Sequence, residues 1–335
     1  MFSTLRPHRL CRAILNPRPK ILRAISNSRK MATIVHSSIP HEDRTASEPR
    51  QNRLEPVTIS HIHPINATTR ILRLKPTDPT HTIAFLPGQW LDTFIPSLPK
   101  AGGFTITSAP ALAHPQNGGY IELAVQNSAN PPARFLHRPE EEILNSPLTV
   151  RVGGSFTYPP ARPRPVQRLV LIAGGVGVNP LVSMLAHIVR QPAGLRPEEI
   201  HFVYGVKAEG SEPELQEILF LPRLMDLCAM AGDEQGPGKV TLSVFLTGST
   251  GRVYGEGERV EHGRLPNRTW ARRMGRGDLV GALDGWGAGG VEGGSGREGT
   301  VAYVCGPQAM TDEVVGFLRE QEGMEEDRVL CEKWW

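Results

Sequence analysis

Two glycine-containing segments have the residue types and spacing that bind the phosphates of a nucleotide. In the first, the apolar strand RLVLIA (168–173) runs into the turn GGVGVNP, and a helical pattern follows over 180–191. Glycines at such a turn let a diphosphate approach the backbone, and the helix N-terminus supplies free N–H groups. Asn179 suits the N-cap and Pro180 the first helical position. We predict a dinucleotide-binding turn; a tight turn without a ligand is the alternative. Its residues are Gly174, Gly175, Val176, Gly177, Val178, Asn179 and Pro180.

The second segment is YVCGP (303–307), where a strand ends at Cys305 and a helix follows over 307–320. In a doubly wound sheet the carboxyl ends of the strands face the ligand. This geometry predicts Cys305, Gly306 and Pro307 at the edge of the nucleotide site. The alternative is a buried thiol that only packs, which is common for cysteine.

The elements around these turns alternate between strand and helix. Buried-type strands are expected at 200–206, 239–246 and 300–306, with candidate helices at 213–220 and 307–320. This alternation predicts a Rossmann-like doubly wound parallel sheet. The domain is expected to span 166–335.

The preceding segment, 54–160, consists of short β-rich runs separated by Pro, Gly and Asn. Such spacing is typical of a small antiparallel barrel or sandwich. The runs are 57–65, 69–76, 88–96, 102–110, 120–126 and 148–156, and the Pro-rich stretch 159–165 is the expected boundary. The predicted fold is therefore a two-domain α+β protein, with an antiparallel β-barrel followed by the Rossmann-like domain.

Residues 248–299 interrupt the second domain and hold 16 of the 35 glycines. A segment so rich in glycine buries little apolar surface, so we expect a flexible surface insertion. An RNA-binding segment is the alternative, but Asp and Glu lie beside the glycines and remove the positive charge that it needs.

The N-terminus carries the positive charge of the chain. Residues 1–41 hold eight Lys or Arg and no acid, whereas the remainder holds 29 basic and 34 acidic residues. An Arg-rich, Ser-containing, acid-free start is typical of a mitochondrial transit peptide. We predict a transit peptide over 1–35 and a linker over 36–53; a disordered basic tail is the alternative.

Composition excludes several other classes of protein. The four scattered cysteines give neither zinc nor iron–sulfur spacing, so no metal site is predicted. No apolar run reaches the roughly 18–20 residues of a membrane span. The acidic balance after residue 41 gives no support for nucleic-acid binding.

Four motifs in order resemble the ferredoxin–NADP reductase superfamily. They are GQW (88–90), FTITS (104–108), GGVGVNP (174–180) and CGP (305–307). GQWLDTFIP (88–96) and the terminal EKWW (332–335) look closest to one subgroup of it. The resemblance implies an FAD-binding barrel, an NAD(P) domain, and hydride transfer from nicotinamide to flavin in the cleft between them.

The resemblance also implies roles for individual residues. Thr105 would offer its hydroxyl near flavin N5, Phe104 would pack on the flavin, and Cys305 would lie by the reacting nicotinamide carbon. Further implied cofactor contacts are Gly88, Gln89 and Ser108. Catalysis would consist mainly of positioning, with Thr105 and Cys305 as the catalytic pair.

Two departures affect the flavin. The superfamily has Arg in the place of Gly102, and that Arg pairs with a flavin phosphate. Its later phosphate-binding turn corresponds to 127–137, where Pro131 and Pro132 supply no N–H donor. Compensation by Arg134 or Ser128 in the same stretch is the alternative. FAD, FMN and the absence of a flavin therefore stay open.

Other features leave alternatives. The stretch 247–252 lacks the adjacent Ser/Arg pair expected for a 2′-phosphate, which favours NAD over NADP. Trp334 and Trp335 either cover the flavin or simply pack.

The function expected is a mitochondrial oxidoreductase that passes a hydride from NAD(P)H to a bound flavin and on to an unidentified acceptor. The alternative is a non-catalytic dinucleotide sensor or complex subunit.

Overall fold

The computed structural model describes residues 40–96, 98–161, 166–208, 214–232, 238–248, 265–285 and 297–333. The predicted transit peptide and the Trp334–Trp335 pair lie outside these residues. Among the helices that the structure describes, none is long and apolar enough to cross a membrane.

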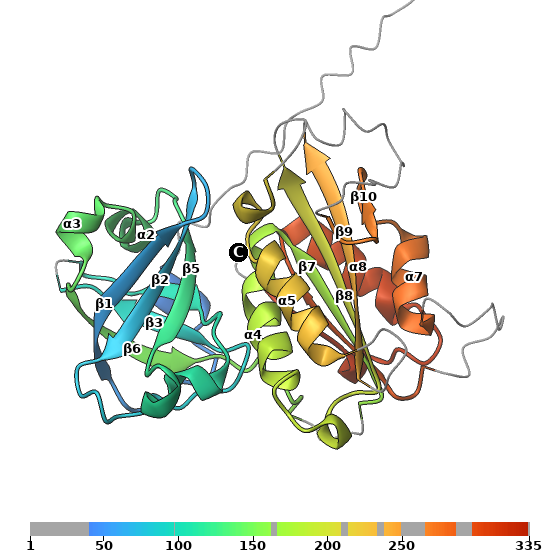
Figure 1. Ribbon diagram of the computed structural model, residues 1–335, viewed down its shortest axis with the longest axis horizontal. Coiled ribbons are helices and arrows are strands. Elements are labelled where there is room, and N and C mark those ends of the chain that lie inside the picture. Colours follow the sequence, from blue (N-terminus) through green and yellow to red (C-terminus); the bar gives the residue numbers. More distant parts are fainter. Residues whose placement is uncertain are drawn as a thin grey trace, which may run out of the picture. The chain divides into compact units, whose positions relative to one another are not determined.

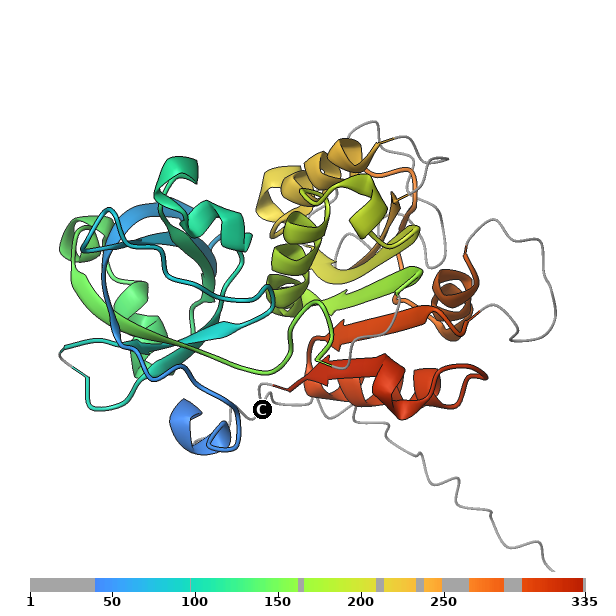
Figure 2. The ribbon, with the colours of Figure 1, turned by 90° about the horizontal axis from the view of Figure 1, so that it is seen from below.

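The first sheet is antiparallel and curves into a barrel (Figures 1 and 2). Its strands, in chain order, are β1 (Glu55–Pro64), β2 (Thr69–Pro76), β3 (Trp90–Phe94), β4 (Gly102–Thr105), β5 (Ile121–Gln126) and β6 (Pro147–Gly153). They pair in the order β4-β3-β6-β1-β2-β5, and a bridge between Ile106 and Leu123 joins the two edges. The antiparallel barrel predicted for 54–160 is therefore confirmed.

The barrel forms because apolar residues alternate along its strands. In β1, for example, Val57 and Ile59 are buried, and after a bulge between Ile59 and His61 the buried residue is Ile62, while His61 and His63 are exposed. A period of two places one face of each strand in the core. Short helices flank the strands: α1 (His41–Arg44), α2 (Pro131–Leu136), α3 (Glu140–Ile143), η1 (Pro110–Ala113) and η2 (Pro115–Asn117).

The second sheet is entirely parallel and has the order β10-β9-β8-β7-β11-β12. Its strands are β7 (Arg168–Gly174), β8 (Glu199–Ala208), β9 (Lys239–Gly248), β10 (Thr269–Trp270), β11 (Thr300–Cys305) and β12 (Val329–Glu332). The α-helices that the structure describes around it are α4 (Val178–Ile188), α5 (Leu221–Ala231), α7 (Arg276–Asp284) and α8 (Gln308–Arg319). Short 3-10 turns are η3 (Gly175–Gly177), η4 (Ala193–Leu195), η5 (Leu215–Glu217) and η6 (Glu326–Arg328).

Helices cover both faces of this sheet. Leu181 of α4 and Leu224 of α5 pack in one apolar cluster with the odd-numbered residues of β7, whereas Leu283 of α7 and Leu318 of α8 pack with its even-numbered residues. Figure 1 shows the two helix pairs on opposite sides of the strands. The predicted doubly wound domain is confirmed.

Three predicted elements differ from the structure. The helix expected at 213–220 is wrong: α5 begins at Leu221, because Phe220 has a left-handed backbone and Pro222 suits the first helical turn. The expectation that all of 248–299 is a surface insertion is also wrong. Its part 265–285 forms β10 and α7, which bury Leu279, Ala282 and Leu283. These few apolar residues were hidden by the glycine-rich composition; the rest of the insertion, other than 248 and 297–299, lies outside the described residues.

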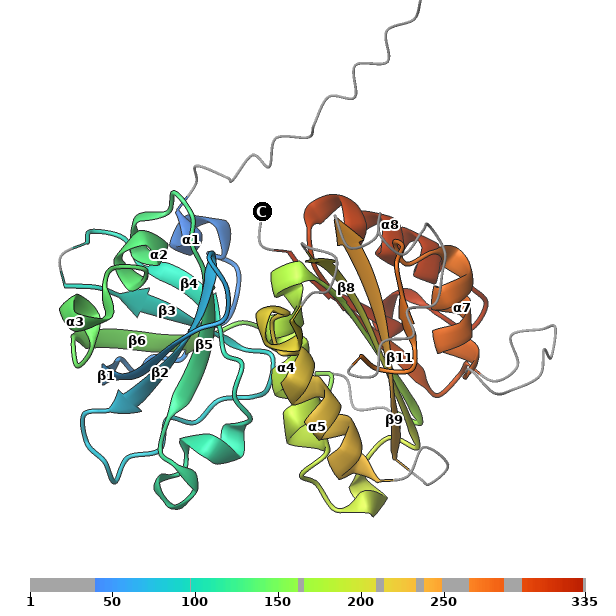
Figure 3. The ribbon, with the colours of Figure 1, turned by 45° about the horizontal axis from the view of Figure 1, so that its top comes forward.

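The predicted linker, 36–53, is wrong for its described part, 40–53. This segment packs on the outer face of β3, β4 and β6 (Figure 3). His41 is buried 3.2 Å from the carboxylate of Asp92, and Arg50 donates to the same carboxylate at 2.8 Å. Asp92 is 0% exposed, and a buried carboxylate needs charged or hydrogen-bonding partners. These contacts hold the segment on the barrel.

Candidate functional site

The two glycine turns of the second domain pack directly against each other. A Cβ atom on Gly177 would lie 2.2 Å from the carbonyl oxygen of Cys305 and 2.6 Å from the nitrogen of Gly306. The Cα of Gly174 lies 3.1 Å from the point where a Cβ on Gly306 would be. These glycines are therefore required by backbone packing between the β7–α4 and β11–α8 turns.

One part of the first turn remains open to a ligand. Gly175 has φ +52°, and a Cβ added there would meet no atom within 4 Å. Val176 beside it is 40% exposed, and Pro307 on the neighbouring turn is exposed. Gly175 and Val176 thus leave space for a phosphate group at the N-terminal end of α4, where the helix dipole favours negative charge.

Asn179 is not the N-cap that the sequence predicts, because α4 begins at Val178, two residues before the predicted start at Pro180, with Gly177 as its N-cap. The Asn179 amide instead donates to the carbonyl of Ala124 in β5 at 3.1 Å. Pro180 is buried in the first turn, as is Val178. Asn179 therefore ties α4 to the barrel.

Three barrel residues predicted to contact a cofactor make structural contacts in the described structure. Ser108 is 2% exposed; its Oγ accepts the N–H of Glu122, and its carbonyl accepts the Ser183 hydroxyl of α4 at 2.7 Å. The Gln89 side-chain oxygen accepts the Leu86 N–H, and its side-chain nitrogen donates to the Gly154 carbonyl. Gly88 has φ +98°, and a Cβ there would lie 2.2 Å from the Phe156 carbonyl oxygen.

Thr105 and Phe104 lie on opposite faces of β4. Phe104 is 9% exposed and packs in the barrel core, so the expectation that it faces a flavin does not match its position. Thr105 points to the outer face, where its partner across the strands is Trp90. Trp90 packs against His41 and lies under the Arg50 guanidinium.

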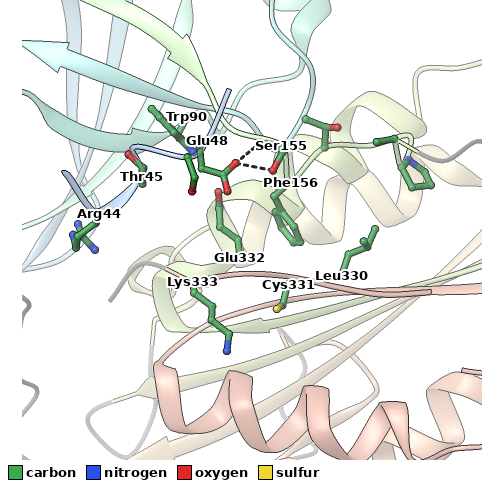
Figure 4. Close-up of a pocket in the computed structure, with 14 residues that line it drawn as sticks. Arg44, Thr45, Glu48, Trp90, Ser155, Phe156, Leu330, Cys331, Glu332 and Lys333 are labelled. Carbon is green, nitrogen blue, oxygen red and sulfur yellow. Dashed lines mark hydrogen bonds between the residues drawn. The ribbon is translucent and has the colours of Figure 1, made fainter. Parts of the chain in front are cut away.

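A cavity of about 350 Å³ lies beside Trp90 (Figure 4). It is lined by Trp90 and residues from 44–48 and 155–161 on one side, and by 330–333 of β12 and its C-terminal end on the other. Glu332 is the register partner of Cys305, just as Trp90 is the register partner of Thr105. The cavity is therefore bounded by the strand neighbours of both predicted catalytic residues.

The cavity wall combines apolar, polar and charged side chains. The Glu48 carboxylate accepts the N–H and the hydroxyl of Ser155, at 3.1 and 2.6 Å. Burial lowers the pKa of the Arg44 guanidinium and raises the pKa of the Cys331 thiol. The Cys305 thiol is fully buried, and its register partner Glu332 lines the cavity together with Leu330, Cys331 and Lys333.

Comparison with known proteins identifies the family. The chain is 33% identical over 300 residues to oxidoreductase NAD-binding domain-containing protein 1 of Danio rerio, covering 88% of this chain and 97% of that relative. It belongs to this family. The human relative of that name is 30% identical, with 88% of this chain and 84% of the relative covered. Residues 166–261 match the ferric reductase NAD binding domain.

The fold of this chain matches solved structures of the ferredoxin–NADP reductase type, as the motifs indicate. A ferredoxin NADP⁺ reductase from Neisseria gonorrhoeae, solved with FAD and NADP, matches with a TM-score of 0.58 at 13% identity, covering 85% of this chain and 100% of that one. The FAD/NAD-binding domain of nitric oxide dioxygenase from Vibrio cholerae matches with a TM-score of 0.56 at 16% identity, covering 83% and 97%.

The arginine that would pair with a flavin phosphate has no room in this member of the family. A Cβ at Gly102 would lie 2.6 Å from both the Pro132 side chain and the Phe104 ring, so there is no room for the superfamily's arginine. Pro131 and Pro132 occupy the first turn of α2 and supply no N–H groups. The cavity beside Trp90 has a volume at the lower end of the range for small-molecule sites.

Sequence reasoning missed the residues that line this cavity. Glu48 and Ser155 are 107 positions apart, and Glu332 gains its place only through pairing of β12 with β11. No local motif marks such long-range neighbours. The strand end at Cys305 was the one available signal, because an adjacent parallel strand must end at the same edge. Ser249 and Arg252, which bear on NAD against NADP, lie outside the described residues.

Proposed function

We propose that the chain is an NAD(P)H-linked oxidoreductase. A reduced nicotinamide dinucleotide binds with its phosphates at Gly175 and Val176, and its hydride passes to an electron acceptor in the cavity between Trp90 and Glu332. The observation that carries this proposal is the position of the cavity, since it borders the strand partners of both Thr105 and Cys305.

The chain's own residues would act by binding and positioning. The open backbone at Gly175 meets the phosphates, while the packed turns behind it keep the site rigid. Trp90 and Phe156 provide apolar wall on the barrel side of the cavity. The superfamily resemblance implies a flavin ring as the acceptor, which supplies the two-electron chemistry that no side chain has.

The test of dinucleotide binding is a charge placed at the open turn. Val176→Asp sets a carboxylate against the phosphates, and because Val176 is exposed the fold tolerates the change. We expect at least about a tenfold loss of NADH affinity by calorimetry, as an ionic contact of roughly 1.4 kcal/mol implies. Leu195→Asp, at a position 71% exposed on η4, is the matched control and keeps wild-type affinity. Equal affinity in wild type and Val176→Asp would contradict the proposal.

A dinucleotide-binding protein without redox turnover is the second candidate. Gly102 favours it, because a Cβ there would lie 2.6 Å from the Pro132 side chain and so leaves no room for the superfamily's phosphate-binding arginine. A protein of this kind binds NADH at the same turn but reduces no flavin under anaerobic conditions.

We also infer a mitochondrial location from the acid-free, Arg-rich residues 1–35. Fusing residues 1–35 to a fluorescent reporter tests this, with import expected. A variant in which the arginines of that segment are replaced by glutamine is the control, and a reporter that stays in the cytosol with the natural segment would contradict the inference.

A further inference from the structure

The segment that leaves the barrel after β6 is bonded to the barrel through its own backbone. The N–H of Gly154 donates to the Pro49 carbonyl at 2.9 Å, and the N–H of Tyr158 donates to the Pro87 carbonyl at 3.1 Å. We call residues 154–158 the joint, because the chain runs from them to the second domain. Both ends of the joint are therefore fixed on the barrel.

The middle of the joint is bonded to the second domain by one side chain, Tyr303 of β11. Tyr303 is 0% exposed, and its hydroxyl donates to the Thr157 carbonyl at 2.8 Å. Its ring meets the Phe156 ring edge-on, with centroids 5.3 Å apart, and lies 6.4 Å from the Tyr158 ring. Tyr303 therefore lies against three consecutive residues of the joint. Cys305 follows it by two positions, at the carboxyl end of the same strand.

Apolar packing also joins the two domains, but it does not set their angle. Ile71, Ala109 and Ala124 of the barrel belong to the same buried cluster as Tyr303 and Leu181 of α4. Apolar burial is non-directional, so this cluster holds the domains together and allows them to slide or rotate by small amounts. A hydrogen bond weakens steeply as its angle departs from linearity. The bond from Tyr303 to the joint therefore restricts the orientation that the apolar contact leaves free.

We propose that Tyr303 is a positioning residue, whose hydroxyl fixes the joint so that a coenzyme on the second domain and an acceptor on the barrel are aligned. This inference rests on the proposed NAD(P)H-linked function. Reacting atoms must approach to about 3–3.5 Å, and a misplacement of about 1 Å can cost roughly 100-fold in rate. Because Tyr303 is fully buried, it acts through the joint and not by contact with a reactant.

The chain offers a matched control for removing this hydroxyl. Tyr204 of β8 is also 0% exposed, and its hydroxyl donates to the Leu219 carbonyl at 3.2 Å, with both residues in the second domain. Tyr303→Phe and Tyr204→Phe each remove one buried hydrogen bond, so both should lower the urea midpoint to a similar extent. Only Tyr303→Phe releases the joint. Hydrogen–deuterium exchange of the amides in 154–158 is therefore expected to be at least tenfold faster in Tyr303→Phe and unchanged in Tyr204→Phe.

The kinetic arm compares coenzyme binding with turnover in the full chain. We expect NADH affinity by calorimetry to stay within threefold of wild type in both variants. Anaerobic reduction of added FMN at saturating NADH should be at least about tenfold slower in Tyr303→Phe and within threefold of wild type in Tyr204→Phe.

Three results would overturn the inference. They are wild-type exchange at the joint in Tyr303→Phe, wild-type turnover in that variant, and an equal loss of turnover in Tyr204→Phe, which would show only the effect of a lost buried bond. Failure of the proposed function gives a different result, in which the wild-type chain reduces no FMN. The exchange rates then decide by themselves whether Tyr303 fixes the joint.

Discussion

Substituting Gly177 tests whether the nucleotide turn is shaped by its neighbour or by a ligand. A Cβ there would lie 2.2, 2.4 and 2.6 Å from the Cys305 oxygen, the Cys305 carbon and the Gly306 nitrogen. All three atoms belong to backbone, so no side chain can rotate away. The turns must separate by about 1 Å to restore a normal contact of roughly 3.2 Å.

The expected cost of Gly177→Ala follows from this overlap. Forcing extra volume into a packed interior costs about 1–3 kcal/mol, and rigid backbone on both sides favours the upper part of that range. In urea denaturation we expect a lower unfolding midpoint, together with weaker NADH binding because the turns have shifted. Gly316→Ala is the control: this helical glycine has no atom within 4 Å of an added Cβ. It should stabilise the chain by up to about 1 kcal/mol.

The opposite pattern would refute the packing argument. If Gly177→Ala unfolds at the wild-type urea concentration and loses only NADH affinity, the glycine serves ligand approach and the turns have room to spare. Normal stability together with normal NADH affinity would contradict both proposed roles of Gly177, packing between the turns and ligand approach.

Two further substitutions test the contacts that hold the barrel. Burial alone would raise the pKa of Asp92, but hydrogen bonds from His41, Arg50 and Arg151 lower it from 3.8 to about 2. Asp92→Asn should therefore lose about 2 kcal/mol of stability at neutral pH, measured by urea unfolding. The lowered pKa makes this contribution full above pH 4, and the difference from wild type should vanish as the pH falls through about 2. A difference independent of pH would contradict it. The Glu122 carboxylate of β5 accepts two hydrogen bonds from Arg223 of α5, one of them at 3.0 Å. Glu122→Gln weakens both bonds. Because that arginine is 32% exposed, the expected loss is about 1–2 kcal/mol, and no change in the urea midpoint would refute it.

The sequence predicted the parts of the fold that depend on local pattern. Alternating residues identified the barrel strands, and apolar runs ending in glycine identified β7 and β11. It could not predict that residues 40–53 pack on the barrel, because the contact that holds them is with Asp92, which is distant in the sequence. Nor could it show that α7 lies within the glycine-rich stretch, where three apolar residues decide the packing.

For the site, the sequence identified the motifs but misassigned several of their roles. Gly177 and Gly306 serve the contact between turns, and Ser108 and Asn179 connect the barrel to α4. These roles depend on which segments meet in space. The cavity likewise exists only because β12 pairs with β11, which no motif records.

The most direct test of the proposed hydride transfer is an anaerobic absorption spectrum of the full chain with an added flavin, FAD and FMN in turn, and a limiting amount of NADH. The proposed function predicts that the flavin absorption bleaches at a rate proportional to protein concentration, with one flavin reduced for each NADH oxidised. It further predicts that Ser155→Trp abolishes the bleaching while leaving NADH binding intact. NADH that binds to the wild-type chain but leaves the flavin oxidised would contradict the oxidoreductase function and support the dinucleotide-binding alternative.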